Sequence, residues 1–261
     1  MHKQVLFTDL GINQPYKAIW DYQEKLLQQN VHIKSVARGY CTPPVETQVL
    51  SAGSQIGSAN TSALFTTPVE YTRPTNYLLF VEHAPVYTLG KSGDIGNVLI
   101  SEEEQQRRHI EFYKTNRGGD ITFHGPQQLV GYPILDLEQF KTDLGWYLRS
   151  LEEVIILTLK HYGLKGDRSK GETGVWLDPD VPGKERKICA MGIRCSRWIT
   201  MHGFAFNVNT NLEYFNYIVP CGIVNKQVTS LQKELGYKVE MDEVCSIVKR
   251  NFEMVFDVQL T

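Results

Sequence analysis

The fold assignment depends on the stretch Arg117-Gly118-Gly119-Asp120-Ile121-Thr122-Phe123-His124-Gly125-Pro126. Its paired glycines allow the backbone to approach a ligand closely, and its Arg and Asp place both signs of charge at one turn. Thr122 and His124 share one face of the strand that follows, because side chains alternate across a strand. A β-hairpin turn with a hydrogen-bonded histidine would use the same residue types, so composition alone leaves both interpretations open.

Short apolar runs on both sides of this stretch predict β-strands. Glycine and proline pairs separate several of the runs, as expected where a chain turns between strands. The predicted strands cover 77–81, 110–114, 121–123, 129–135, 174–177, 188–194, 197–202 and 205–208.

Four segments have helical spacing or helix-start signals. They are 13–30, a short exposed helix capped by Ser101, a long helix between Asp143 and Gly163, and a last helix from near Asp242 to 255. Helices and strands interleave here without strict alternation. We therefore expect an α/β (α+β) fold in which helices pack on a mixed β-sheet, rather than a doubly wound fold.

Composition and charge narrow the class of protein. The chain has 261 residues, with 27 Lys and Arg against 29 Asp and Glu, which gives a formal charge of -2. A general nucleic-acid binder would show a basic excess. The 42% share of apolar residues argues against a disordered chain. The five cysteines are an odd number at no regular spacing, so free thiols are expected.

The sequence shows no signal for a membrane. No apolar run approaches the roughly 20 residues that a membrane helix needs, and the first residues lack the apolar core of a signal peptide. We therefore expect a cytoplasmic protein. A segment rich in Ser, Thr, Pro and Gly, at about 39–75, predicts a surface insertion within a single domain.

Two familiar motifs are rejected. Gly90-Lys91-Ser92 resembles the end of a phosphate-binding loop, but Pro85 stands where the first glycine of that loop belongs. Cys189, Cys195 and His202 lack the spacing of a closed zinc site. We expect no metal.

Segment 184–221 is a second concentration of polar residues. By strict strand alternation, one side carries Lys187, Cys189, Met191 and Ile193, and the other carries Ile188, Ala190, Gly192 and Arg194. The small residues leave room for a ligand on the second side. Further on, Cys221 follows a proline in a turn-prone context, where a buried and inert thiol is the commonest outcome.

Four motifs in series resemble those of the lipoyl(octanoyl) transferase family. They lie at 86–92, 117–126, 187–194, and 201–205 together with 218–223. The resemblance spans roughly 77–223. It implies the fold of the biotin and lipoate protein ligase catalytic domain, which is similar to that of class II aminoacyl-tRNA synthetases, and a single catalytic domain over 1–261.

The family transfers an octanoyl or lipoyl group from acyl carrier protein to a lysine of lipoyl domains through an enzyme thioester. The acceptors implied are the lipoyl domains of 2-oxoacid dehydrogenase complexes or the glycine cleavage H protein. The resemblance makes Cys221 the acylated nucleophile and Lys187 the group that lowers its pKa. It implies three substrate-binding segments: Arg117, Gly118, Gly119, Asp120, Ile121, Thr122, Phe123 and His124; Ala190, Met191 and Gly192; Gly203, Phe204 and Ala205.

Attack on a thioester needs a thiolate, and a free cysteine with a pKa of about 8.5 is only slightly ionised at pH 7. A cationic lysine beside Cys221 would favour the thiolate. From residue types alone, His124 or His202 would be the base, because histidine titrates nearer to pH 7. The resemblance favours Lys187 instead. Transfer from a thioester to an amide runs downhill, so we expect no cofactor and no ATP.

The implied substrate also makes demands on the pocket. An octanoyl group has seven carbons beyond its carbonyl, and burying them could contribute roughly 5 kcal/mol before ordering costs. We expect the end of the groove to select tail length. We also expect a basic rim that attracts the acidic carrier protein, with candidates Lys184, Arg186, Arg194 and Arg197.

Three features depart from the family pattern. Gln127 stands where a glycine is usual, Cys189 replaces a small residue and is a rival nucleophile, and segment 39–75 is longer than the usual link. Two other functions stay open. One is an ATP-dependent lipoate-protein ligase of the same fold, which would not need Cys221. The other is a non-catalytic module that binds an acyl group or a carrier protein.

Overall fold

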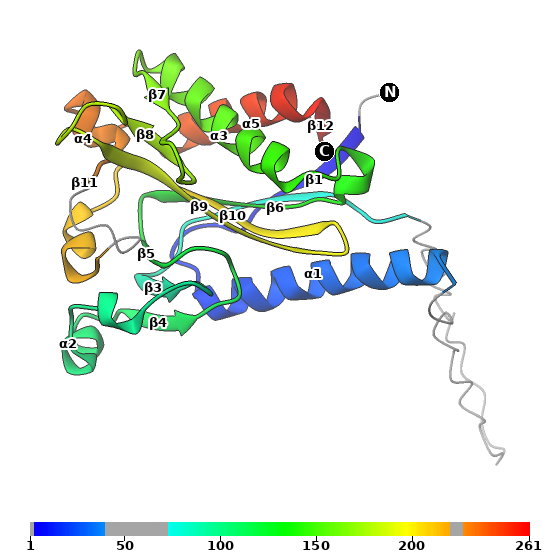
Figure 1. The fold of residues 1–261 in the computed structure, drawn as a ribbon, viewed down its shortest axis with the longest axis horizontal. Coiled ribbons are helices and arrows are strands. Elements are labelled where there is room, and N and C mark those ends of the chain that lie inside the picture. Colours follow the sequence, from blue (N-terminus) through cyan, green and yellow to red (C-terminus); the bar gives the residue numbers. More distant parts are fainter. Residues whose placement is uncertain (1–2, 40–72, 220–226) are drawn as a thin grey trace, which may run out of the picture.

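Two β-sheets organise the computed structural model, which describes residues 3–39, 73–219 and 227–261 (Figure 1). In the larger sheet the strand order is β12-β1-β2-β6-β10-β9-β8-β7, and β11 pairs with β9. Its strands are β1 (Lys3–Asp9), β2 (Tyr77–Val81), β6 (Gln128–Ile134), β7 (Gly166–Asp167), β8 (Val175–Leu177), β9 (Arg186–Ser196), β10 (Ile199–Asn207), β11 (Gln227–Val228) and β12 (Val258–Leu260).

Strand directions in the larger sheet are mixed. β1 runs parallel to β12 and β2, and β11 runs parallel to β9. The remaining pairs are antiparallel. A smaller sheet has the order β4-β3-β5, formed by β3 (Val86–Leu89), β4 (Glu111–Lys114) and β5 (Ile121–His124). The predicted mixed sheet is confirmed.

Helices cover both faces of the larger sheet. α3 and α5 lie together on one face, and α1 lies on the other, where the smaller sheet and α2 are also found (Figure 1). The helices are α1 (Tyr16–Ala37), α2 (Glu102–Arg107), α3 (Leu144–His161), α4 (Leu231–Leu235) and α5 (Met241–Phe256), with 3₁₀ turns η1 (Ile95–Asn97), η2 (Leu137–Gln139) and η3 (Leu212–Tyr217). Within the described ranges, no helix is both long and apolar enough to cross a bilayer.

The helix-boundary signals in the sequence are largely confirmed. The Asp143 carboxylate accepts a hydrogen bond from the amide of Trp146, 2.9 Å away, and Gly163 follows α3 with a left-handed φ of 74°. The Ser101 hydroxyl caps α2. α1 runs on to Ala37, well past its predicted end at residue 30, because Lys34 in its last turns is buried against an acidic partner.

The strand predictions need two corrections. Five strands were not predicted: β1, which has no clear polar alternation, β3, which has only four residues, and β7, β11 and β12, which have two or three residues each. Segments 197–202 and 205–208 were predicted as separate strands but form one strand, β10. Gly203 does not end the strand, because at this position β10 packs so closely against β6 that only glycine fits. A Cβ on Gly203 would lie 2.2 Å from the Gly131 carbonyl oxygen of β6.

A β-bulge in β9 overturns the predicted alternation of its side chains. Cys189 pairs with Val175, but Lys187 pairs with the next residue, Trp176, so Ile188 is an extra residue between them. Ile188 and Cys189 therefore both pack in the core beneath α3 and α5. Strict alternation predicted that Lys187 and Cys189 share a side of the strand, and this prediction is wrong. Lys187 lies with Ala190 on the opposite side.

The pair formed by Lys34 and Asp136 generates a stability prediction. Their side chains are 6% and 5% exposed and the Nζ–Oδ1 distance is 2.6 Å. Lys34→Ala leaves the Asp136 carboxylate buried without its main cation, which should cost about 3–5 kcal/mol of unfolding free energy.

Lys17→Ala is the matched control, because Lys17 pairs with Asp21 on the exposed surface of the same helix. It should cost less than about 1 kcal/mol. Urea denaturation of both variants checks the prediction, and equal losses would contradict it.

Candidate active site

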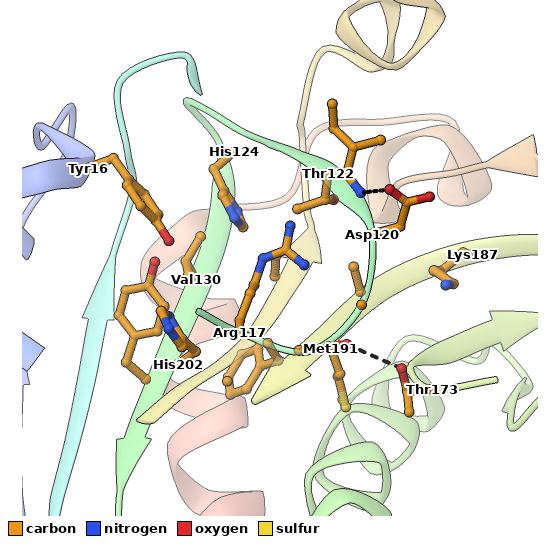
Figure 2. Close-up of a pocket in the computed structure, with 18 residues that line it drawn as sticks. Tyr16, Arg117, Asp120, Thr122, His124, Val130, Thr173, Lys187, Met191 and His202 are labelled. Atoms are coloured by element: carbon orange, nitrogen blue, oxygen red, sulfur yellow. Dashed lines mark hydrogen bonds between the residues drawn. The ribbon is translucent and has the colours of Figure 1, made fainter. Parts of the chain in front are cut away.

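A narrow pocket lies where the two sheets meet the first turn of α1 (Figure 2). Its internal space is about 70 Å³. Residues from α1, β5, β6, β9 and β10 and from two loops line it: Tyr16, Arg117, Gly119, Asp120, Ile121, Thr122, His124, Val130, Tyr132, Thr173, Lys187, Ala190, Met191, Gly192, His202, Gly203, Phe204 and Ala205.

The pocket brings together most of the residues that the sequence predicts for the site. All three predicted substrate-binding segments and Lys187 contribute to its lining. Gly118 and Phe123 do not. The Gly118 amide donates to the Ile193 carbonyl, 2.9 Å away, and the Phe123 ring packs in a separate core against Tyr87 and Tyr214. Cys221 lies outside the described residues.

The two ends of the pocket differ in character. Figure 2 shows Lys187 and Thr173 at one end and Tyr16, His124 and His202 at the other, with the Arg117 side chain between them in this view. Ala190 and Gly192 of β9 also line the pocket. A ligand that lies along β9 would therefore meet an amine at one end and buried rings at the other.

Arg117 and Asp120 hold the walls of the pocket together. The Arg117 guanidinium is buried and donates to both the carbonyl and the hydroxyl of Thr88. The Asp120 carboxylate accepts from the Asn97 side-chain amide at 2.6 Å and from the Asp94 backbone amide at 3.2 Å. Arg117 thus joins this turn to β3, and Asp120 joins it to the segment around η1.

The histidines at the inner end are buried and neutral. Burial lowers the pKa of His202 to about 3, with Arg117 and Arg194 adding to the effect, and lowers the pKa of His83 to about 4. Burial also holds the pKa of His124 well below its ordinary value. A base that operates near pH 7 titrates near that pH, so these environments do not favour the alternative base assignment to His124 or His202.

His202 has a defined tautomer. The Asn116 side chain donates its amide to Glu24 at 2.8 Å, so its oxygen faces His202 Nε2 at 2.7 Å, and Nε2 carries the proton. The backbone of His202 is left-handed, with φ at 60°, and its amide donates to Gln23. The surrounding contacts therefore impose an uncommon conformation on a pocket residue.

Cys189 is poorly suited to be the nucleophile. Its side chain is fully buried in the core beneath α3, and this burial raises the pKa of the thiol. The bulge in β9 also turns it away from the side that carries Lys187. A thiol in such surroundings is protonated and inaccessible.

Glycines in the lining serve backbone packing. A Cβ on Gly192 would lie 2.7 Å from the Gly118 carbonyl oxygen, and one on Gly203 would lie 2.2 Å from that of Gly131. The sequence suggests that small residues here leave space for a ligand. Part of that space is filled by neighbouring backbone, and Ala190 and Ala205 are the small side chains that line the slot.

Several lining residues escaped the sequence-based prediction. Tyr16, Val130, Tyr132 and Thr173 line the pocket without belonging to the predicted segments, and His202 was proposed only as a base. Tyr16 stacks on His124 with ring centroids 5.9 Å apart. No local signal connects the first turn of the first helix to a site about one hundred residues away; the stacking arises only from the tertiary fold.

The predicted basic rim is partly neutralised. Arg186 forms ion pairs with Glu234 and Asp178, and Arg194 pairs with Glu24. Arg197 donates to the Ser35 hydroxyl. Lys184 and Arg197 are exposed at the surface. Two of the four predicted cations therefore have carboxylate partners and contribute less positive charge than expected.

Gln127 takes the conformation that a glycine would favour, with φ at 61°. The Glu82 carboxylate accepts a hydrogen bond from its amide at 2.5 Å, and Asn209 donates to its side-chain oxygen at 2.9 Å. These contacts stabilise a left-handed turn without glycine.

Two contacts bracket the chain on either side of Cys221. The Val219 amide donates to the Asn97 carbonyl, 2.8 Å away, and the Asn97 side chain is in turn held by Asp120. On the other side, Gln227 pairs with Arg186, the neighbour of Lys187. The described residues on either side therefore lie against η1, which contacts the lining residue Asp120, and against the start of β9.

Comparison with known proteins identifies the fold class and then the family. The lipoyl protein ligase A/B catalytic domain matches residues 61–253. In solved structures, a bipartite lipoate protein ligase from Thermoplasma acidophilum has a TM-score of 0.63 at 14% identity, covering 100% of this chain and 86% of its own. A lipoate-protein ligase A bound with ATP has a TM-score of 0.62 at 13% identity, covering 100% and 88%. These two likenesses show the fold alone.

The sequence relatives are much closer. An octanoyltransferase from Christiangramia forsetii is 51% identical over 262 residues, covering 100% of this chain and 99% of its own. One from Flavobacterium johnsoniae is 50% identical over 262 residues and covers 100% of both. The chain belongs to the octanoyltransferase family. Because both relatives align over its whole length, segment 39–75 is not an addition confined to this chain.

The buried histidines predict a loss of stability in mild acid. Below about pH 6.5 the histidines of the unfolded chain take up protons, whereas His83, His124 and His202 do not while the chain is folded. The unfolded state then binds more protons, so the unfolding free energy falls as pH drops from about 6.5 toward the folded-state values, by about 1.4 kcal/mol per pH unit for each group.

Urea denaturation at pH 7.5 and 5.5 measures this slope. His83→Gln should reduce the fall in unfolding free energy between these two pH values by about 1.4 kcal/mol. His161→Gln, at a side chain that is 45% exposed, should leave it unchanged. Equal slopes in the two variants would show that burial of His83 is not the cause.

Proposed function

We propose that this chain transfers an octanoyl group from acyl carrier protein to a specific lysine of a lipoyl domain, through a thioester on Cys221. The acceptors would be the lipoyl domains of 2-oxoacid dehydrogenase complexes or the glycine cleavage H protein. The observation that carries the proposal is the bulge in β9, which places Lys187 in the same narrow slot as the three predicted substrate-binding segments. The relatives named octanoyltransferase, about half identical over the whole chain, support it.

The slot suits the tail of the proposed substrate. Ala190, Met191, Phe204 and Ala205 contribute apolar surface to its lining, and its narrow space favours an unbranched chain. The thioester end would lie beside Lys187, and the tail would run along β9 toward Tyr16. Desolvation of the tail supplies binding free energy.

The first half-reaction needs a thiolate and a proton donor. The Cys221 thiolate attacks the thioester carbonyl, the new sulfur–carbon bond forms, and the bond to the carrier's sulfur breaks. The Lys187 ammonium gives a proton to the departing thiolate and becomes a neutral amine. Before the reaction, the same ammonium favours the thiolate through charge attraction.

The second half-reaction restores both groups. The neutral amine of the acceptor lysine attacks the octanoyl thioester, an amide bond forms, and the bond to Cys221 breaks. Lys187 takes the proton that the acceptor nitrogen loses, so the thiolate and the ammonium are regenerated. No nucleotide takes part in either step.

Intact mass spectrometry after incubation with octanoyl carrier protein, without ATP, tests the reaction class. We expect an octanoyl adduct that peptide mapping assigns to Cys221, and Cys221→Ser should lose it. Cys189→Ala should retain both adduct and transfer, because Cys189 is buried on the other side of β9.

Strict dependence on ATP, with no adduct, would favour the lipoate-protein ligase alternative. Binding without any adduct or transfer would favour the non-catalytic module. An adduct that maps to Cys189 would overturn the site assignment.

A substitution in the middle of the slot tests where the tail lies. Ala190→Leu adds three carbons at a lining position of β9, so octanoyl transfer should fall at least about ten-fold, because overpacking excludes the long tail. Butyryl transfer should fall much less. Ala37→Leu, the same substitution at an exposed position near the end of α1, is the control. Equal losses for both chain lengths would place the tail elsewhere.

A further inference from the structure

Lys187 lies between an aromatic ring and a carboxylate. Its Nζ is 4.6 Å from the centre of the Trp176 ring and 3.8 Å from Glu172 Oε2. The Lys187 and Glu172 side chains are only 12% and 18% exposed. A cation in this setting interacts with the face of the ring and with the carboxylate, and reduced contact with water strengthens both interactions.

The loop that carries Glu172 is anchored on two sides. The amide of Gly174 donates to Glu152 Oε1 of α3 at 3.1 Å, and Glu152 is fully buried. The Thr173 hydroxyl donates to the Met191 carbonyl of β9 at 3.2 Å. Glu172 therefore sits on a loop tied both to α3 and to the strand that bears Lys187.

Arg168 strengthens the same anchor. Its guanidinium bonds Glu152 at 3.0 Å and Glu153 at 2.6 Å, both on α3. The buried Glu152 carboxylate thus has two cations, Arg168 and Arg149, and a backbone donor as partners. Arg168, Glu152 and Glu153 are not among the residues that line the slot, and their effect is to fix the loop that presents Glu172.

Other titratable groups share the pocket with Lys187. Arg117 and Asp120 are occupied by the contacts to β3 and to the segment around η1 described above. His124 and His202, at the far end, are neutral. On its own strand, Cys189 is a protonated thiol on the other face. Of these groups, Glu172 combines negative charge with an ion-pair distance to Nζ.

We propose that Glu172 is a positioning residue for Lys187: its carboxylate holds the ammonium at the mouth of the slot, beside the Trp176 ring. This inference rests on the proposed function, in which the Lys187 ammonium returns a proton to the leaving thiolate. Deprotonation of Lys187 would then limit the rate at alkaline pH. Removing the Glu172 charge would make the rate begin to fall at a lower pH.

Steady-state transfer from octanoyl carrier protein to a lipoyl domain, measured from pH 6 to 10, tests the inference. Glu172→Gln should shift the descending limb of the kcat profile down by about one pH unit, because an adjacent carboxylate favours a charged amine. The KM for octanoyl carrier protein should stay within about two-fold, since the carboxylate lies outside the slot lining. Glu172→Asp should give an intermediate shift.

Asp178→Asn is the matched control. Asp178 undergoes the same loss of charge near the start of β9, but it is 49% exposed and pairs with Arg186. Its pH profile should match that of the unmodified chain. A descending limb that stays in place in Glu172→Gln overturns the inference, whether or not the overall rate falls. If that variant does not fold, the same criterion applies to Glu172→Asp.

A double variant separates action through Lys187 from a structural effect. In the Lys187→Ala background, Glu172→Gln should cause no further loss of transfer. An equal further loss would overturn the inference. The octanoyl adduct on Cys221 is measured in the same preparations. If the adduct forms but the descending limb of the kcat profile does not move in Glu172→Gln, the role of Glu172 is rejected and the proposed function stands. If the unmodified chain forms no adduct, the proposed function itself is rejected.

Discussion

The extra residue in β9 is the constraint on which the candidate site depends. Side chains in a strand alternate, so an uninterrupted β9 would turn Lys187 toward the core that lies beneath α3 and α5. The bulge at Ile188 reverses that phase and brings Lys187 beside Trp176 at the mouth of the slot. From Cys189 onward, regular pairing with β10 resumes and keeps Ala190 opposite Ala205 in the slot lining. The bulge thus places the Cys189 thiol and the Lys187 amine, two positions apart in sequence, on opposite faces of β9.

The walls of the slot depend on close backbone contact and on neutral buried rings. The loop at Gly118 approaches Gly192, and β6 approaches Gly203, so closely that a side chain on either glycine would collide with a carbonyl. At the inner end, Tyr16 stacks on His124, and His83 bonds the Tyr132 hydroxyl at 2.7 Å. Burial keeps these histidines uncharged, because an isolated charge is costly where water is excluded.

The sequence predicts the mixed sheet, the capped helices and most of the pocket lining, because each leaves a local mark. Asp143 and Gly163 bound α3 by their own chemistry, and the motif from Arg117 to His124 concentrates its polar residues in one short stretch. The features that the sequence does not predict depend on contacts between distant parts of the chain. The sidedness of Lys187 depends on a bulge defined by pairing with β8, and the contribution of Tyr16 depends on how α1 docks. Pairing register and helix docking are properties of the whole fold.

The smaller sheet has its own hydrophobic core, built around Tyr87, Phe123 and Phe215, separate from the cores on the two faces of the larger sheet. The loop from Arg117 to Asp120 leads into β5 of that sheet and forms one wall of the slot. The slot therefore lies on the boundary between separately packed cores: contacts within the smaller core support its Arg117–Asp120 wall, and the larger sheet supplies the strands on its other side.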